Sequence, residues 1–478
     1  MQGDTASMEA PMCSTIMDSN SFKPSDLDGL DPQTRELVER RRVLGPSYRL
    51  FYKHPLHFVK GLGTRLYTAD GEEYLDAYNN VVSVGHCHPH VVEAICRQVS
   101  TLNTHTRYLH EGIVDYAEHL VALLPPEVDR VMFECSGSEA NDLAVRVARA
   151  ATGGTGVIVT SEAYHGNTAL ITGLSPSIGA DQPMLPDMRM IPSPDTWRLG
   201  TNDIGAWMAA RVAEQIADMR RHGFKFAALL VDSIFSSDGV YPGAPSSPEA
   251  REGFLKPVVD LVHKEGGLFI ADEVQPGFAR TGEAFWGFER HGVVPDIVTM
   301  GKPMANGMPC SAMAARHEVL EAFSSQTPYF NTFAGNPVSM AAAQAVLEVL
   351  QGEHIQQNAL ETGLLFKNAL IDAAKRHPCL GDVRGAGFFI GVDVVKPGTK
   401  EPDYEHAVNF IEAMREHHVL TSLCGPAGNI LKIRPPLVFS PNDVGIFMDA
   451  LEKSLGGWAF KCRRKPCSNL KWYANGLK

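Results

Sequence analysis

The amino-acid sequence lacks the marks of a membrane, secreted or nucleic-acid-binding protein. No apolar run in its 478 residues reaches the length of a membrane span. The first 22 residues contain no lysine or arginine but include Asp4, Glu9 and Asp18, so neither a secretory signal nor an arginine-rich transit peptide is expected. The net charge of −12 disfavours contact with nucleic acid or an anionic membrane. We therefore expect a cytoplasmic protein that binds neither.

Cysteine is also scarce, and its pattern does not suit a disulfide framework or a zinc site. The chain has nine cysteines, an odd number, and they are scattered. Three histidines and Cys87 gather in His86-Cys87-His88-Pro89-His90, which raises a metal hypothesis. The carboxylates and the second cysteine–histidine pair of a zinc site are missing nearby, and Pro89 suits the first turn of a helix. We expect no metal, and reduced thiols in a cytosolic enzyme.

The composition and the order of patterns indicate an α/β protein with two domains. Hydrophobic residues make up 44% and charged residues 21% of a chain that is too long for one ordinary domain. Strand patterns alternate with helical patterns between residues 131 and 315, which predicts a predominantly parallel sheet covered by helices. From about residue 345 the pattern changes to mixed helices and strands, which predicts a smaller α+β domain.

The predicted boundaries divide the chain into five segments. Residues 1–44 would be a disordered N-terminus and a helical arm, and residues 45–90 the N-terminal part of the small domain, with a hairpin at 58–67 before the turn signal Asp70-Gly71. The large domain would span residues 91–345, the C-terminal part of the small domain residues 346–459, and a basic tail residues 460–478.

One lysine stands at an unusual place. Lys302 follows the apolar stretch at residues 296–300 and is flanked by Gly301 and Pro303, a pattern that predicts a buried strand ending in a tight turn. Most lysines are instead solvated on the surface. An ammonium group with little water around it has a lowered pKa and can act as an amine nucleophile. Lys302 is therefore predicted to form a Schiff base with a carbonyl cofactor.

Two acids end a second apolar stretch. Asp272 and Glu273 follow residues 267–271, where a purely structural strand gains nothing from carboxylates. A carboxylate at such a strand end can pair with the protonated ring nitrogen of pyridoxal phosphate. A lysine and an aspartate at the ends of two strands therefore predict a pyridoxal-phosphate site.

Two further segments could complete that site. Ser136-Gly137-Ser138 lies between a strand expected at 131–135 and a helix expected at 142–151, where backbone N–H groups, hydroxyls and the helix dipole can hold an anion. An ordinary capped turn is the alternative. Tyr164 follows a strand expected at 157–160, so its ring could stack on a planar cofactor or belong to the core.

Five motifs follow one another along the chain and carry a family resemblance. They are Ser136-Gly137-Ser138-Glu139-Ala140-Asn141, Tyr164-His165-Gly166, Asp272-Glu273-Val274-Gln275, Gly301-Lys302 and Asn331-Thr332-Phe333-Ala334-Gly335-Asn336-Pro337. In this order they resemble the class III aminotransferases, a family of pyridoxal-phosphate enzymes, over roughly residues 45–455. Other strings, such as Leu431-Lys432-Ile433-Arg434-Pro435-Pro436, look most like the ethanolamine-phosphate phospho-lyase branch and its aminotransferase relatives.

The resemblance implies a fold, a cofactor and an assembly. The fold would be that of fold type I pyridoxal-phosphate transferases, with a mainly parallel sheet of the seven-stranded type in the large domain and a smaller α+β domain built from both termini. Lys302 and Asp272 would be the catalytic residues. The cofactor, pyridoxal 5′-phosphate, would be bound by Ser136, Gly137, Ser138, Tyr164, His165, Asp272, Gln275, Lys302 and Thr332. Thr332 would reach the phosphate from the partner subunit of a homodimer with shared sites, which could be part of a tetramer.

The substrate end of the site departs from the family's pattern. Asp232 stands where the family usually has a glutamate, and Lys432 stands where it has an arginine, with Arg434 close by. Lysine is a point charge and grips a carboxylate less specifically than arginine does. Together with Asn80 and Arg107, these three residues are predicted to bind the substrate.

Two reactions stay open. In both, a primary amine would displace Lys302, which would then take the Cα proton. Transamination of a small amine or amino acid to a keto acid, through a Lys302 aldimine and a ping-pong mechanism, is the first hypothesis because most of the family transaminates. Elimination of phosphate and ammonia from a phosphorylated amine such as O-phosphoethanolamine is the alternative.

Two hypotheses from other classes are weaker. A catalytically inactive relative that serves as a binding or scaffold protein is disfavoured because Lys302, Asp272 and Gln275 are all present. A Rossmann-type dehydrogenase is disfavoured because Gly153-Gly154-Thr155-Gly156 precedes its strand instead of following it.

Overall fold

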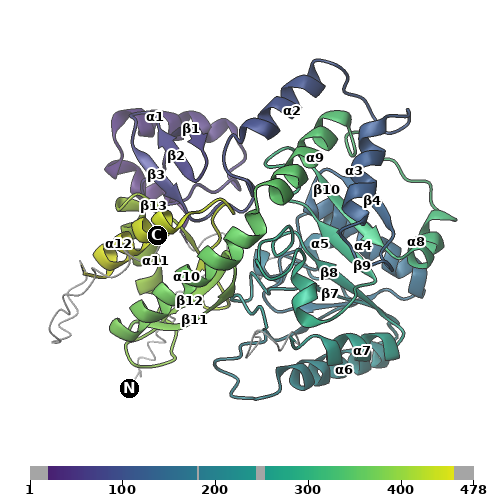
Figure 1. Cartoon of the computed structure of the whole chain (residues 1–478). Helices are drawn as coiled ribbons and strands as arrows, with labels where there is room; N and C mark the ends of the chain where they lie inside the picture. The colour runs from purple at the N-terminus through teal and green to yellow at the C-terminus, as the bar shows by residue number, and fades with distance from the viewer. Residues whose placement is uncertain (1–19, 180–181, 244–252, 457–478) are drawn as a thin grey trace, which may run out of the picture.

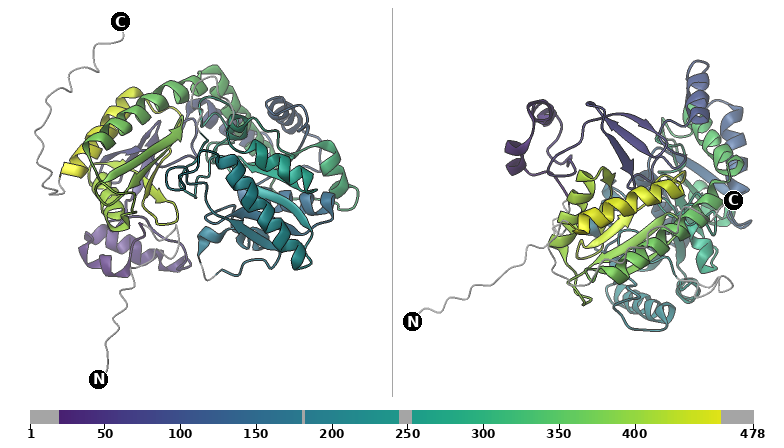
Figure 2. Two further views of the ribbon diagram at one scale, coloured as in Figure 1. Left: turned by 90° about the horizontal axis from the view of Figure 1, so that it is seen from below. Right: turned by 60° about the vertical axis from the view of Figure 1, so that its left-hand side comes forward.

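The computed structural model describes residues 20–179, 182–243 and 253–456. Figure 1 shows a large part built on one wide sheet and a smaller part in which N-terminal and C-terminal segments lie together. The left view of Figure 2 confirms that these two end segments lie on the same side of the large sheet. Within the described ranges, no helix combines the length and the apolar character needed to cross a bilayer.

A seven-stranded sheet forms the large domain, with strand order β4-β10-β9-β8-β7-β5-β6. Neighbours from β9 to β6 pair in parallel, whereas β10 pairs antiparallel with both β4 and β9. The mainly parallel sheet expected from the sequence is thus confirmed. Its strands are β4 (Arg130–Glu134), β5 (Gly156–Thr160), β6 (Met188–Ile191), β7 (Phe226–Asp232), β8 (Leu268–Asp272), β9 (Ile297–Met300) and β10 (Ser311–Ala315).

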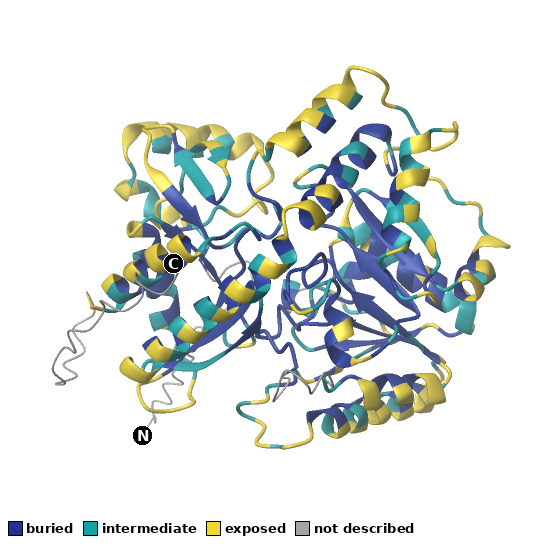
Figure 3. Ribbon diagram, in the orientation of Figure 1, coloured by how far each residue is buried: buried dark blue, intermediate teal, exposed yellow. Residues whose placement is uncertain are grey.

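Helices cover both faces of this sheet because side chains of its strands are apolar on both sides. In β5, the side chains of Val157 and Val159 belong to one hydrophobic cluster, on one face of the sheet. Ile158, which lies between them, belongs to a second hydrophobic cluster, on the opposite face. The first cluster includes α4 (Gly137–Thr152), α5 (Ala169–Thr172) and α8 (His317–Ser324), and the second includes α3 (Glu111–Val121), α6 (Ile204–Arg221), α7 (Lys256–Lys264) and α9 (Pro337–Gly352). Figure 3 shows the strands buried and the helices exposed on their outer faces.

The small domain contains two four-stranded sheets. One has the order β1-β2-β3-β13 and joins the two ends of the chain, since β3 pairs in parallel with β13. The other has the order β11-β12-β15-β14 and is antiparallel. The strands are β1 (Phe58–Leu62), β2 (Arg65–Thr68), β3 (Glu73–Asp76), β11 (Leu380–Ala386), β12 (Phe389–Val394), β13 (Val419–Leu420), β14 (Ser422–Cys424) and β15 (Ile430–Ile433). The remaining helices are α1 (Pro32–Arg40), α2 (Pro89–Val99), α10 (Ile355–Arg376), α11 (Tyr404–Glu416) and α12 (Pro441–Gly456).

The structure corrects several local predictions. Helix α4 begins at Gly137 and not at residue 142, because Ser136 caps it by accepting a hydrogen bond from the Glu139 N–H (3.3 Å) and donating to the Glu139 carboxylate (2.9 Å). The segment expected as one hairpin is a three-stranded meander, in which the Asp70-Gly71 signal turns β2 into β3. Strand β11 and helix α6 were not predicted.

Some predictions fall outside what the structure describes or tests. Residues 1–19, predicted to be disordered, and the basic tail at 460–478 lie outside the described residues. Helix α1 occupies the segment expected as a helical arm. The domain boundaries proposed at residues 45, 91 and 346 stay predictions.

Candidate active site

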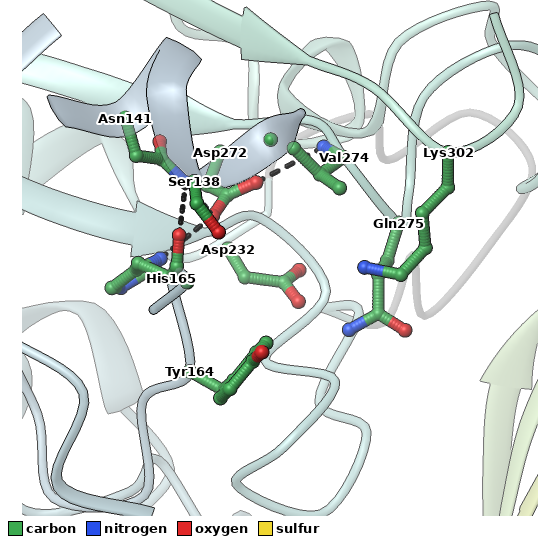
Figure 4. Close-up of a pocket in the computed structure, with 11 residues that line it drawn as sticks. Ser138, Asn141, Tyr164, His165, Asp232, Asp272, Val274, Gln275 and Lys302 are labelled. Atoms are coloured by element: carbon green, nitrogen blue, oxygen red, sulfur yellow. Dashed lines mark hydrogen bonds and ion pairs between the residues drawn. The ribbon is translucent and has the colours of Figure 1, made fainter. Parts of the chain in front are cut away.

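A pocket lies at the edge of the large sheet where its parallel strands end. Because the carboxyl ends of these strands meet at one edge, the residues that terminate or follow β5, β7, β8 and β9 come together there, beside the first turn of α4. The lining residues are Gly137, Ser138, Asn141, Tyr164, His165, Gly166, Asp232, Asp272, Val274, Gln275 and Lys302 (Figure 4).

Lys302 enters the pocket from the turn after β9, as the sequence pattern indicates. The N-terminal segment at residues 83–85 holds this turn: the Ser83 hydroxyl donates to the carbonyl of Pro303 (3.0 Å), and the Asn306 amide donates to the carbonyl of Gly85 (2.8 Å). Burial lowers the pKa of Lys302, the two pocket aspartates raise it, and the nearby arginine charge of Arg434 lowers it. The lowered pKa makes the amine a better nucleophile and base near neutral pH.

Asp272 ends β8, is almost fully buried, and has three hydrogen-bond donors. One oxygen accepts from His165 Nδ1 (2.7 Å) and from the Asn141 amide (2.9 Å), and the other accepts from the Val274 N–H (3.0 Å). Thr299 fixes the Asn141 amide by donating to its oxygen (2.6 Å). These three donors fix the orientation of the carboxylate. His165 lines the pocket as expected, and its contact in the structure is with Asp272.

The first turn of α4 forms a cup for an anion. Gly137 and Ser138 of this turn line the pocket, where the N–H groups of a helix start are suited to an anion, whereas Ser136 is engaged as the helix cap. Gly166 closes the cup with φ of 136°, and a side-chain carbon there would lie 2.4 Å from Ser138 Oγ. Only glycine can therefore occupy position 166 without moving the cup.

A series of hydrogen-bonded side chains connects the cofactor end of the pocket to the small domain. The Gln275 amide donates to the Ser236 hydroxyl (2.5 Å), and its oxygen accepts from the Asn80 amide (3.2 Å). The Asn80 oxygen in turn accepts from Arg434 (2.7 Å), whose guanidinium also lies over the ring of Tyr78, 4.5 Å from its centroid. Asn80 and Arg434 were predicted near the substrate, and the structure connects both to Gln275.

Lys432 on β15 and Arg434, directly after this strand, are buried basic residues. Their exposed fractions are 4% and 9%, and within the described part of the chain neither forms an ion pair with a carboxylate. Lys432 lies over the ring of Phe389, 5.6 Å from its centroid, and Arg434 Nε is buried without a hydrogen-bond partner. Burial and the charge of Arg434 lower the pKa of Lys432 to about 7. A buried lysine and a buried arginine that form no ion pair with the described residues are suited to an anionic ligand.

Asp232 faces these cations from the end of β7. Burial raises its pKa, and the charge of Asp272 adds to the effect. Its own loop opposes the rise, because the N–H groups of Ile234 (2.9 Å) and Ser236 (3.2 Å) donate to its two oxygens. Asp232 is thus tied to its own loop and, among the described residues, forms no ion pair with an arginine.

Arg107 and Thr332, two of the predicted residues that do not line this pocket, lie on the surface. Arg107 is exposed and stacks on Phe330, with its guanidinium carbon 4.2 Å from the ring centroid. Thr332 is exposed as well, next to Asn331, which donates to the buried Glu134 (2.7 Å). Within a single chain, neither Arg107 nor Thr332 therefore reaches the lining of the pocket.

The histidines of the histidine-rich segment lie against carboxylates. Each of its three histidines faces one carboxylate: His86 faces Asp76 (2.7 Å), His88 faces Glu353 (3.3 Å) and His90 faces Glu348 (2.6 Å). Across the described ranges, no three His, Cys, Asp or Glu side chains gather in a way that could hold a metal ion. Pro89 begins α2, as its place in the sequence indicates.

Sequence reasoning missed three residues of the site. Asn141 holds Asp272, and its only signal was its place at the end of the Ser136–Asn141 motif. Ser236, which orients Gln275, lies in a loop without any motif. Tyr78 stacks on Arg434 from a segment far away in the sequence, and no local pattern marks it.

The residues present fit pyridoxal phosphate. A side-chain carbon would collide with Ser138 at Gly166 and would press on Val274 at Gly137, so both glycines keep the wall of the cup compact beside a helix start that is suited to a phosphate. Asp272 is positioned to hold a protonated ring nitrogen, and Gln275 has an amide that can reach a ring oxygen. Tyr164 has an aromatic face for the ring, and Lys302 has the amine. The chemistry that this donor set supports is the activation of a primary amine.

Comparisons with known proteins agree with this geometry. The family model described as aminotransferase class-III matches residues 51–455. An alanine–glyoxylate aminotransferase 2-like protein of Drosophila melanogaster is 37% identical over 432 residues, which cover 87% of this chain and 86% of that protein. An ethanolamine-phosphate phospho-lyase homolog of Caenorhabditis elegans is 37% identical over 459 residues, 91% of this chain and 96% of that protein.

A solved structure is similar over nearly its whole length. It is a phospholyase from Arthrobacter in complex with phosphoethanolamine, 39% identical, with a TM-score of 0.83. The match covers 88% of this chain and 99% of that one. The similar proteins therefore include both an aminotransferase-type relative and phospho-lyases.

Proposed function

Because the chain belongs to the class III aminotransferase family, whose members depend on pyridoxal phosphate, we propose that it acts on a small primary amine whose far end carries an anion. The observation that carries the proposal is the pair of buried cations, Lys432 and Arg434, without a carboxylate partner in the described residues. An unpaired buried charge costs several kcal/mol, on the order of 3–5 for a pair that loses one partner. A bound anion offsets that cost, so the pair is a receptor for the anionic end of the substrate.

The residues of this chain can carry out the first chemical step. When bound, pyridoxal phosphate supplies a carbonyl that condenses with amines and a protonated ring that accepts electrons from Cα. Lys302 Nζ, with its lowered pKa, takes the proton from the substrate Cα. Asp272, held in place by its three donors, is positioned to accept a hydrogen bond from a protonated ring nitrogen. Lys432 and Arg434 orient the substrate from its other end.

The cation pair favours phosphate elimination among the two open reactions. A phosphate group carries nearly two negative charges near neutral pH, which two cations match better than one carboxylate does. Arg434 is fixed by Asn80 and Tyr78, which suits an enzyme with one kind of substrate. In such an elimination the Cα proton goes to Lys302, the C–O electrons leave with phosphate, and water releases ammonia and an aldehyde. The similar Arthrobacter phospholyase was solved with phosphoethanolamine.

Transamination is the second candidate. Relatives named as aminotransferases support it, among them the Drosophila protein at 37% identity. Lys432 and Arg434 would hold the carboxylate of an amino donor or a keto acid in the same place. Reprotonation away from the substrate, followed by transfer of the amino group to a keto acid, would then replace the departure of phosphate.

One experiment separates the two reactions. The holoenzyme is incubated with O-phosphoethanolamine alone, and separately with small amines or amino acids plus pyruvate or 2-oxoglutarate. Release of inorganic phosphate without a keto acid is the expected result. Formation of alanine or glutamate with no phosphate release would contradict elimination and favour transamination. The Lys302→Ala variant is the control, and it should be inactive in both assays.

We also propose a homodimer, or a tetramer of such dimers, with shared active sites. An exposed strip of large apolar side chains supports it: Tyr108 is 67%, Leu109 103% and Phe333 71% exposed. Thr332 lies within this strip, beside a hollow of about 400 Å³ lined in part by Phe330. Light scattering at low protein concentration tests the assembly, and a monomer that retains full activity would contradict it.

A cytoplasmic location is part of the same proposal. The six cysteines that the structure describes are all free thiols, and two of them, Cys87 and Cys96, are exposed. Free exposed thiols are typical of a reducing compartment. Fractionation of cells that express the tagged protein tests this, and recovery in an oxidising or organellar fraction would contradict it.

A further inference from the structure

One face of the β11-β12-β15-β14 sheet is turned toward the large domain. In antiparallel sheets, residues directly opposite each other point to the same face. Arg384 on β11 lies opposite Gly391 on β12, Gly391 lies opposite Lys432 on β15, and Lys432 lies opposite Ser422 on β14. These four residues therefore form one row across the sheet. The predicted anion ligand Lys432 and the arginine Arg384 flank a glycine in that row.

A loop of the large domain, residues 232–241, packs onto the gap that this glycine leaves. A side-chain carbon at Gly391 would lie 3.0 Å from Val240 Cβ and 3.2 Å from the carbonyl oxygen of Gly239. Val240 also shares a small apolar cluster with Phe389 and Ile430 of the sheet. The loop backbone thus lies directly on the row, between Arg384 and Lys432.

Arg384 binds the loop at this point through hydrogen bonds. Its guanidinium donates to the carbonyl of Gly239 (2.7 and 3.0 Å) and to that of Val240 (2.9 Å), and it lies over the ring of Tyr241, 4.6 Å from the centroid. The fully buried Asp393 orients the guanidinium from behind (2.5 Å). Val240 has φ of 67°, a conformation that a β-branched residue resists, so the loop keeps this shape only while it is held.

The other end of the same loop belongs to the pocket. Asp232 lines the pocket at the start of the loop, and Ser236 accepts the hydrogen bond from Gln275. The contact of residues 239–240 with the sheet therefore joins the reactive end of the site to Lys432, which lies in the other domain. A shift of this loop against the row of residues on the sheet would therefore change the distance between Lys432 and the reactive end of the pocket.

We infer that Arg384 is a positioning residue: by holding Gly239 and Val240 over Gly391, it sets how far Lys432 stands from the reactive end of the pocket. This inference rests on the proposed role of Lys432 in binding the anionic end of the substrate. Arg384 itself touches neither reacting atoms nor pocket lining. Its effect passes through the loop, so it should alter substrate binding without altering the cofactor.

Two variants of the full-length holoenzyme test the inference. Arg384→Lys keeps a positive charge but cannot donate to two carbonyls and a carboxylate with the same fork. Gly391→Ala changes no charge and pushes Val240 by a few tenths of an ångström. Misplacement on this scale costs about tenfold in kcat/KM. Because the shift affects capture of the substrate's anionic end, we expect the loss as a rise in KM for O-phosphoethanolamine in each variant. The visible absorption of the bound cofactor and kcat should stay close to those of the parent enzyme.

Arg198→Lys is the matched control. Arg198 also pairs with the buried Asp393 (2.7 Å), but its other hydrogen bonds go to Asp195 and to the carbonyl of Lys400, away from the loop. It should leave KM unchanged. An equal rise in KM for this control would overturn the inference, because it would indicate general loosening of the domain contact.

A Lys432→Met variant separates the inference from the function on which it rests. If KM does not depend on Lys432, the proposed anion receptor is wrong. If KM depends on Lys432 but is the same as in the parent for Arg384→Lys and Gly391→Ala, only the positioning role is wrong. Should Arg384→Lys fail to fold, Gly391→Ala alone decides, since it retains every hydrogen bond of the grip.

Discussion

The pH dependence of activity tests the anion receptor most directly. Lys432 is buried, and its pKa of about 7 places its charge change in the range where enzymes are assayed. The ammonium form is present below this pKa and is lost as pH rises through it. Replacement by arginine keeps the charge at all these pH values, since a guanidinium does not lose its proton. The Lys432→Arg variant should therefore lack one ionisation that the parent enzyme shows.

The magnitude follows from the pKa. At pH 8 only about one lysine in eleven would carry the proton, and each further pH unit removes about tenfold more of the charged form. The dependence of kcat/KM on pH reports ionisations of the free enzyme. The ratio of parent to Lys432→Arg kcat/KM for O-phosphoethanolamine should thus fall about tenfold per unit above pH 7. Taking the ratio removes the titrations of the substrate and of Lys302, which both enzymes share.

The assay is a continuous measurement of phosphate release between pH 6 and 9 at low substrate concentration. A ratio that stays flat across this range would refute the reasoning, because it would mean that the charge of Lys432 does not matter for capture of the substrate. A simple amine such as n-propylamine, followed in single turnovers, is the control. It has no anion at its far end, so its profile should be the same in both enzymes.

Three further predictions follow from the same site. Lys432→Met should raise the free energy of unfolding of the ligand-free protein at pH 7 by about 1–3 kcal/mol, because it removes a buried cation whose folded pKa lies below its unfolded value. Urea unfolding measures this change. The difference between the two proteins should shrink as pH rises from 7 toward 10. His165→Phe removes one donor from Asp272 and should lower kcat about tenfold while the fold is kept, as steady-state kinetics and circular dichroism will show. Gly166→Ala should weaken cofactor binding by about tenfold or more, since its side-chain carbon would overlap Ser138; titration of the apoenzyme with pyridoxal phosphate measures it, and unchanged affinity would argue against the phosphate cup.

Residues at strand ends could be predicted from the sequence because their signals are local. Lys302 and Asp272 each follow a short apolar run, and strand and turn are both visible in the residues next to them. The ends of parallel strands gather at one edge, so recognition of the strands was enough to bring these two together. The start of α4 was placed too late because the Ser136–Glu139 cap was interpreted as part of the loop.

The parts that could not be predicted depend on contacts between distant segments. Arg434 meets Asn80 across 354 positions of sequence, and Arg384 meets Gly239 across 145. No periodicity or motif records such a contact, because it depends on how the two domains pack. Strand β11 was missed for a local reason: Gly381 and Gly385 interrupt its pattern, and it exists because β12 pairs with it.

The pairing of β3 with β13 has a consequence for how the protein is made. During synthesis the N-terminal part of a chain emerges first, at roughly 5–20 residues per second. All seven strands of the large sheet are present once Ala315 has emerged, but β13, which pairs with β3, begins only at Val419, and Arg434, which donates to Asn80, comes later still. On the order of ten seconds therefore separates the completion of the cofactor cup from that of the anion receptor. The nascent chain can therefore complete its cofactor end before its anion receptor, and the meander β1-β2-β3 lacks its fourth strand until β13 has been made.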